Sequence, residues 1–416
     1  MAAGLLALAC AVASVAPSFA EPAGVGGGHP QGGFLRTDPI REGQWQLREY
    51  GITAAWRHST GAGVTVAVID SGVDGSHPDL VGQVLPGTDL VESGGDGHLD
   101  PVGHGTAVAA LIAGRGDDRE GVVGIAPDAK ILPVRVLDAD NRYDDAQVVA
   151  RAVRWAVDNG AQVINLSLGG TATSAALAAA IDYAFDRDVV VVACTGNVTS
   201  PTATEVWYPA REPGVVAVTG LTRRADELWP SALTGPQTVL AAPATDLISA
   251  RPDGYWRVQG TSFAAPIVAA TAALIRARWP TMTAGEVVNR LIDTARDLGP
   301  AGRDDTFGFG RVDPLAALTA DVPKVDRNPL DDGVSPGTVG LGPAPGRHTA
   351  PTPGTPPNVR ARGLDSGWAD RSSTARPADR PGTLNPWLLL ILIPVAGGAL
   401  LVVLRLRRNG RWRRPE

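Results

Sequence analysis

The sequence contains little cysteine, little lysine and few long hydrophobic runs. Cys10 and Cys194 are the only two cysteines among 416 residues. Cys10 lies in an expected signal peptide, so Cys194 is left alone in the exported chain and an internal disulfide framework is excluded. Cys194 stands in the apolar run "VVVVACTGN", where a buried, inert thiol is expected rather than a reactive one.

Positive charge comes almost entirely from arginine. Lys130 and Lys324 are the only lysines among 37 basic residues, and 43 acidic residues bring the net charge to −6. This balance provides no global positive field, so nucleic acid is not an expected partner. We find no internal repeat, which argues against an array of small units.

The long hydrophobic runs lie at the two ends of the chain. Residues 1–20, "MAAGLLALACAVASVAPSFA", end in a small-x-small pattern and predict a signal peptide cleaved after Ala20, although no basic residue precedes the apolar stretch; a short buried helix is the alternative. Residues 387–404 carry no charge and are long enough to span a bilayer. The arginine-rich tail 405–416 follows, so we expect a single-pass protein with its bulk outside the cytoplasm.

The middle of the chain alternates continuous apolar runs with helical patterns. Continuous apolar runs are typical of strands buried on both faces of a parallel sheet. We assign them to residues 64–69, 131–137, 162–168, 189–195 and 215–220. Residues 145–160 and 174–188 have helical spacing. The pattern predicts an α/β sandwich with a mostly parallel central sheet, helices on both faces, and functional residues at the carboxyl ends of the strands.

The composition divides the chain into six segments. A short extension and one or two lead-in helices ending at Gly61 precede the sheet, and a stretch rich in Pro, Gly, Ser and Thr follows the α/β domain as a disordered linker. The signal peptide, extension, α/β domain, linker, transmembrane helix and cytoplasmic tail are predicted at residues 1–20, 21–43, 44–320, 321–386, 387–404 and 405–416.

The motif "GTSFAAP" predicts that Ser262 lies at the N-terminus of an apolar helix. Pro266 is tolerable in a helix only near its start, where a missing N–H costs little. Free backbone N–H groups and the helix dipole favour negative charge there, which suits a nucleophile that generates an oxyanion. A helix start with close packing is the alternative that these seven residues leave open.

Two further motifs carry reactive side chains. Asp70, in "VAVIDSGVD", is expected at the end of the first buried strand, and His104 opens an apolar helix in "GHGTAVAALIAG". Asp70, His104 and Ser262 supply an orienting acid, a base and a nucleophile for acyl transfer. Four other histidines, at 29, 58, 98 and 348, lie in polar sequence, whereas His77 is expected to pack or to cap a turn.

These three motifs, in this order, resemble those of the subtilisin-like serine proteases, the peptidase S8 family. The segments "SHPDL", "GIAPDAKILPVRVL", "VINLSLGG" and "GFGRVDP" resemble family segments in the same order, over about residues 45 to 318. The resemblance implies a subtilisin-like three-layer sandwich, a serine endopeptidase activity, and a protein or peptide substrate. It also implies that Asp70, His104 and Ser262 form the catalytic triad.

The resemblance assigns further roles at the site. Asn197, in "CTGN", matches the family's oxyanion asparagine and would act with the Ser262 backbone N–H. Its other readings are a glycosylation sequon, "NVT", and a turn residue. Ser167, Leu168 and Gly169 resemble the family segment that pairs with an extended substrate.

No metal or other cofactor is expected. The acidic segments 138–145 and 116–120 offer oxygen ligands of the kind calcium binds, but neither has a recognisable loop spacing, so solvated acidic loops are favoured.

The order of segments resembles the mycosins, the membrane-anchored subtilases of type VII secretion systems. Mycosins commonly have a cysteine just before the Gly-His-Gly-Thr motif, where this chain has "DPVGHGT". The resemblance implies secretion-complex membrane proteins as partners and allows two functions. One is cleavage of exported proteins near the membrane; the other is a mainly structural role in a membrane secretion complex, with proteolysis secondary.

Overall fold

The centre of the fold is a parallel sheet of seven strands. The computed structural model describes residues 38–92, 94–143, 145–199, 204–224, 226–331 and 376–377. The strands are β1 (Thr65–Asp70), β2 (Thr88–Asp89), β3 (Lys130–Arg135), β4 (Val163–Leu166), β5 (Val190–Cys194), β6 (Val216–Leu221) and β7 (Leu240–Pro243). They lie in the order β2-β3-β1-β4-β5-β6-β7, and every neighbouring pair is parallel. The five expected strands are confirmed, and β2 and β7 extend the sheet at its edges.

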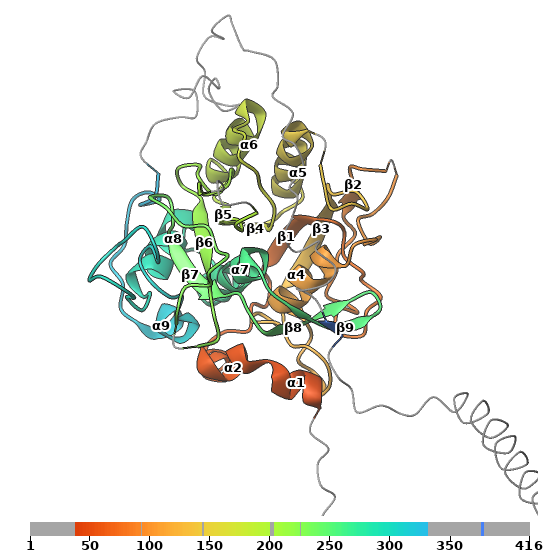
Figure 1. Cartoon of the computed structure of the whole chain (residues 1–416), viewed down its shortest axis with the longest axis horizontal. Helices are drawn as coiled ribbons and strands as arrows, with labels where there is room; N and C mark the ends of the chain where they lie inside the picture. Colours follow the sequence, from red (N-terminus) through yellow and green to blue (C-terminus); the bar gives the residue numbers. More distant parts are fainter. Residues whose placement is uncertain are drawn as a thin grey trace, which may run out of the picture. The chain divides into compact units, whose positions relative to one another are not determined.

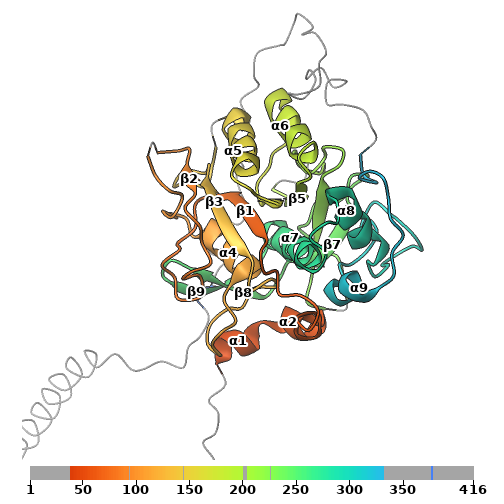
Figure 2. The ribbon, with the colours of Figure 1, turned by 180° about the vertical axis from the view of Figure 1, so that it is seen from behind.

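Helices cover both faces of this sheet (Figures 1 and 2). α5 (Ala146–Asp158) and α6 (Ala175–Phe185) lie together on one face, and α4 (His104–Ala113) and α7 (Thr261–Arg278) lie together on the other. The arrangement follows from right-handed crossovers, because the β1-to-β3 and β3-to-β4 connections run in opposite directions along the sheet. The predicted three-layer α/β architecture is confirmed.

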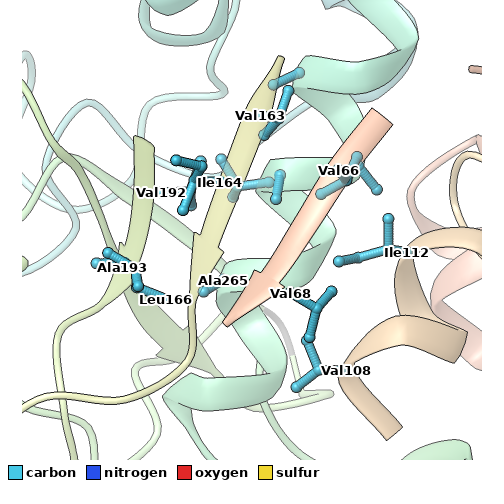
Figure 3. Close-up of a cluster of buried hydrophobic side chains, with 14 of the residues drawn as sticks. Val66, Val68, Val108, Ile112, Val163, Ile164, Leu166, Val192, Ala193 and Ala265 are labelled. Atoms are coloured by element: carbon cyan, nitrogen blue, oxygen red, sulfur yellow. The ribbon is translucent and has the colours of Figure 1, made fainter. Parts of the chain in front are cut away.

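The core lies between the strands and the inner helices. Figure 3 shows Val66 and Val68 of β1 beside Val108 and Ile112 of α4, with Ala265 of α7 near β4. All ten residues of α4 are buried. Small and β-branched side chains fill this layer, so the helices approach the sheet closely.

Smaller elements flank the sandwich. These are the helices α1 (Pro39–Gly43), α2 (Trp45–Glu49), α3 (Ile52–Ala55), α8 (Ala284–Asp293) and α9 (Pro314–Thr319), and the strands β8 (Leu247–Arg251), β9 (Gly254–Val258) and β10 (Arg376–Pro377). β8 and β9 form an antiparallel hairpin, and β10 pairs with β9. Three short helices therefore stand where one or two were expected.

The predicted segment boundaries meet the structure at two places. α1 begins within the expected extension, where Asp38 caps its first turn. Beyond position 320, the Leu330 carbonyl accepts from the Gly214 N–H and the Asn328 amide donates to the Gly214 carbonyl. Contacts with the α/β domain thus continue into the segment expected as linker.

The expected membrane span does not fall within the described part of the chain. No helix among the described residues is long and apolar enough to cross a bilayer. The signal peptide, most of the extension, the span 387–404 and the tail 405–416 lie outside the described residues.

Candidate active site

The sequence-predicted residues gather at the carboxyl edge of the sheet. Asp70 is the last residue of β1, His104 the first of α4, and Ser262 the second of α7. β1 and β4 are neighbours whose following helices cover opposite faces, which is the switch point where open α/β sheets bind their ligands. Residues almost two hundred positions apart in the sequence therefore lie at the same edge of the sheet.

Asp70 and His104 form a buried hydrogen-bonded pair. His104 Nδ1 lies 2.7 Å from Asp70 Oδ1, and the two side chains are 1% and 0% exposed. The Ser71 backbone N–H donates to the same oxygen at 2.7 Å. On its other side the His104 ring packs on Phe263, with ring centroids 5.2 Å apart. The imidazole is thereby held against the first turn of α7, which carries Ser262.

Asp100 ties the Asp70 and His104 segments together. Its Oδ1 accepts from the Ser71 hydroxyl at 2.8 Å and from the Gly103 N–H at 2.7 Å. Its Oδ2 accepts from the N–H and hydroxyl of Thr106 at 2.9 and 2.6 Å. Burial raises the pKa of the Asp100 carboxyl above its ordinary value, and these hydrogen bonds oppose the rise. Motif reasoning did not find Asp100, although it precedes the Gly-His-Gly-Thr motif closely.

Pro266 lies in the first two turns of α7 and leaves one helix carbonyl without its usual donor. Proline has no N–H, so it cannot donate to the carbonyl of Ser262, four residues earlier. The Ser167 hydroxyl donates to that carbonyl instead, at 2.7 Å, and itself accepts from the Asn165 amide at 2.9 Å. Ser167 was predicted as a substrate-binding residue; its hydroxyl faces the helix and holds the Ser262 backbone in place.

Asn197 is fixed by the residue before the serine. Its Oδ1 accepts from the Thr261 N–H at 3.1 Å and from the Thr261 hydroxyl at 2.9 Å. The Thr261 hydroxyl also accepts from the Gly196 N–H at 3.2 Å. These bonds orient the Asn197 amide, and its Nδ2 lies near Gly260, at the mouth of α7. Asn197 is 5% exposed, which disfavours the glycosylation alternative.

Gly260 permits this approach. Its φ of +142° is a conformation that other residues rarely adopt. Its N–H donates to the Ala244 carbonyl at 2.8 Å, and the chain then turns directly into α7. The first turn of α7 therefore begins beside the Asn197 side chain, and its first free N–H, that of Thr261, points at that side chain.

Cys194 lies next to Ser262. The Ser262 hydroxyl donates to Cys194 Sγ at 3.9 Å, and the thiol lies 4.0 Å from the Leu168 carbonyl oxygen. Cys194 is completely buried, as expected, and burial raises the pKa of its thiol to about 11. A neutral thiol therefore forms part of the floor beneath the serine.

The segment that includes Leu168 and Gly169 runs beside this floor. Leu168 is 3% exposed, so its side chain belongs to the core, and its carbonyl oxygen lies 4.0 Å from Cys194 Sγ. Gly170 exchanges two backbone hydrogen bonds with Tyr208, of 2.9 and 2.7 Å. The carboxyl end of β4 is thus held in extended geometry, the form that can pair with a peptide.

Carboxylates of the acidic segments bond to their own loops and to α1, where Arg41 donates to Asp118 Oδ1 at 3.4 Å. Asp138 Oδ1 accepts from the backbone N–H groups of Asp140 and Arg142, and Asp117 pairs with Arg115. Among the described residues, no group of three or more His, Cys, Asp or Glu side chains could hold a metal ion. His77, expected to pack or to cap a turn, does both: it is buried against the Tyr255 ring, with centroids 5.3 Å apart, and its Nδ1 accepts from the Asp79 N–H at 3.2 Å.

Comparison with known proteins gives consistent matches. Residues 61–310 match the model of the Subtilase family. The chain is 38% identical to subtilisin E of Bacillus subtilis over 290 residues, 68% of this chain and 74% of that protein. It is 34% identical to mycosin-1 of Mycobacterium tuberculosis over 338 residues, 67% of this chain and 74% of that protein. The solved structure of MycP1 without its N-terminal propeptide has a TM-score of 0.60 and 34% identity, and covers 68% of this chain and 98% of that one.

Proposed function

Because this chain belongs to the subtilase family, we propose that it is a membrane-anchored, extracytoplasmic serine endopeptidase that works through Asp70, His104 and Ser262. The family membership makes it a subtilisin-like serine protease related to the mycosins. The buried Asp70–His104 hydrogen bond beside the helix turn of Ser262 is the observation that supports the residue roles best.

In this proposal Ser262 attacks the substrate carbonyl while His104 removes its proton. A serine hydroxyl is a weak nucleophile on its own and needs such a base. Asp70, bonded to Nδ1, selects the tautomer with a basic Nε2 and stabilises the imidazolium after transfer. His104 then returns the proton to the leaving amine, and water repeats the sequence on the acyl-enzyme.

The oxyanion of the tetrahedral intermediate is proposed to bind the Asn197 amide and the Ser262 N–H. Support comes from Thr261, whose two donors occupy Asn197 Oδ1 and leave Nδ2, which lies near Gly260, as the donor. Donors fixed before reaction need no reorganisation when charge develops. The main chain of residues 167–169 would pair with the extended substrate.

Export, anchoring and the secretion role are also part of the proposal. They rest on the apolar segments 1–20 and 387–404 and on the arginine-rich tail. The similarity to mycosins points to the membrane proteins of a secretion complex as partners; one similar solved structure, MycP1, is described as an essential component of the type VII (ESX-1) secretion system.

Active-site labelling tests the enzymatic proposal. We expect a fluorophosphonate probe to label the full-length wild-type protein, and Ser262→Ala to abolish labelling. Ser76→Ala, which removes an exposed hydroxyl bonded to Asp74, is the matched control and should label fully. An unreactive wild type, or labelling that survives Ser262→Ala, contradicts the assigned nucleophile.

A cell-based comparison separates catalysis from scaffolding. Cells carrying Ser262→Ala are compared with cells lacking the protein for export of secretion substrates. If cleavage is the main function, both strains lose processing and behave alike. Continued export in Ser262→Ala cells alone would instead establish the structural role as the more important one.

A further inference from the structure

Trp207 lies between two main-chain segments of the proposed substrate site. Its side chain is 3% exposed. The Trp207 backbone N–H donates to the Thr195 carbonyl at 2.8 Å, and the backbone of the next residue, Tyr208, is paired with that of Gly170. Residues 207 and 208 therefore join the end of β4, the proposed substrate-pairing segment, to the end of β5, which leads to Asn197.

The indole fills the space between these ends. A methyl group added to Gly196 would lie 2.1 to 2.5 Å from three atoms of the Trp207 ring, so the ring rests directly on the Gly196 backbone. A methyl group added to Gly169 would lie 3.2 Å from the Trp207 Cβ. The Trp207 side chain thus extends from the β4 segment to the β5 segment at van der Waals distance.

A bound peptide needs room at this place. With its carbonyl at Ser262 and Asn197 and its main chain along residues 167–169, the substrate residue on the acyl side of the scissile bond directs its side chain between the two segments. Successive side chains of an extended peptide point in opposite directions, so this side chain cannot turn elsewhere while the backbone stays paired.

We propose that Trp207 determines specificity by closing this pocket, so that the protease cleaves after small residues, Gly, Ala or Ser, and rejects large apolar and aromatic ones. The inference rests on the proposed function and names its substrate class. A large side chain would have to displace a buried indole that two glycines fit closely, which costs binding in the transition state.

A series of peptide p-nitroanilides that differ only in the residue before the scissile bond tests this proposal. For the full-length wild type we expect kcat/KM to be roughly 100-fold higher for Ala than for Phe, the scale on which pockets discriminate by size. Trp207→Ala should lower the Ala/Phe ratio roughly 10- to 200-fold. Trp279→Phe is the matched control, because Trp279 lies at the far end of α7, and its ratio should stay at the wild-type value.

Two further measurements test the proposal if Trp207→Ala folds poorly. Trp207→Leu keeps an apolar side chain and should shift the ratio in the same direction by less. Peptidyl boronic acids, which mimic the tetrahedral intermediate, should inhibit the wild type much more strongly with an Ala than with a Phe side chain.

Three results overturn the inference while the protease assignment stands. They are a wild type that prefers Phe, equal inhibition by the two boronic acids, and an unchanged ratio in an active Trp207→Ala. Failure of the proposed function has a different signature: the wild type cleaves no peptide and the fluorophosphonate probe does not label Ser262.

Discussion

The helices on the two faces of the sheet differ in what they bury. α5 and α6 bury alanine, valine, leucine and isoleucine, with Tyr183 as the one residue that carries a polar atom. α4 and α7 also bury polar and charged side chains, namely His104, Thr106, Thr261, Ser262, Thr271 and Arg276. Both layers contact β1, β3 and β5, and four of these six side chains lie in the first turns of α4 and α7, so the difference reflects mainly what lies at the N-termini of the helices.

Each buried polar group of the α4/α7 layer has a specific partner. Thr106 bonds Asp100, Thr261 bonds Asn197, and His104 bonds Asp70. On the other face, Arg154 and Arg187 stack on the ring of Tyr183, whose hydroxyl donates to Asp158, and none of these residues belongs to the predicted site. Substitutions in the α5/α6 layer should therefore change stability alone, whereas those in the α4/α7 layer should change catalysis.

The largest effect is expected from Asp70→Asn. The amide cannot hold the same His104 tautomer, so kcat should fall by about 10⁴-fold with little loss of fold stability. Asp158→Asn in α5, which alters the acceptor of the Tyr183 hydroxyl, is the control and should keep wild-type kcat. Peptide hydrolysis and thermal unfolding of both variants provide the comparison; an Asp70→Asn enzyme within tenfold of wild type would exclude the assigned role.

Asn197→Leu should have the next largest effect. Removing one oxyanion donor typically costs about 10² to 10³ in kcat while KM changes little. Thr261→Val removes the hydroxyl that fixes Asn197 and should lower kcat by less. Thr261→Ser keeps that hydroxyl and should retain the wild-type kcat. Asn159→Leu at the end of α5 is the control. A raised KM with unchanged kcat would show that Asn197 binds substrate rather than the transition state.

Much of the sheet could be predicted because its strands are buried on both faces. "VTVAVI" has a single polar residue, the half-buried Thr65, and β1 forms there. β2 was missed because two residues are too short to form a recognisable run, and β7, Leu240–Pro243, because alanine and proline replace the β-branched residues typical of strands. The β8–β9 hairpin was missed although Asp253-Gly254 marks its turn, because its strands lie outside the alternation of strand and helix.

The residues that touch the reacting groups could be found by motif, but their supports could not. Asn165 and Ser167 lie nearly a hundred residues from the Ser262 carbonyl that they help to hold. Asp100 bonds to Ser71 and Thr106, and nothing in the sequence around either residue indicates a buried partner. The position of Trp207 could not be predicted either, because it depends on β4 and β5 ending side by side in the sheet.

A matched pair of core substitutions, one in each helix layer, should have an effect of intermediate size. Ile181 in α6 and Ile112 in α4 are both fully buried. Each Ile→Ala change should lower the free energy of unfolding by about 2 to 5 kcal/mol. Only Ile112→Ala should also lower kcat, because α4 begins at His104. Urea unfolding with peptide hydrolysis tests this, and equal kcat values in the two variants would contradict the division between the layers.

The smallest effect is expected from alkylating reagents, despite a thiol beside the serine. Burial raises the pKa of Cys194 to about 11, and a raised pKa favours the neutral form at every pH below it. At pH 8 only about one thiol in a thousand would be ionised, against roughly a quarter for an ordinary cysteine. Iodoacetamide at pH 8 should therefore leave both activity and Cys194 unchanged, as measured by peptide mapping, which separates Cys194 from Cys10. In urea the thiol regains its ordinary pKa and should react completely. Rapid alkylation of the folded protein would mean that the floor beneath Ser262 opens to solvent, and the close packing of Cys194 against Ser262 and Leu168 would then need revision.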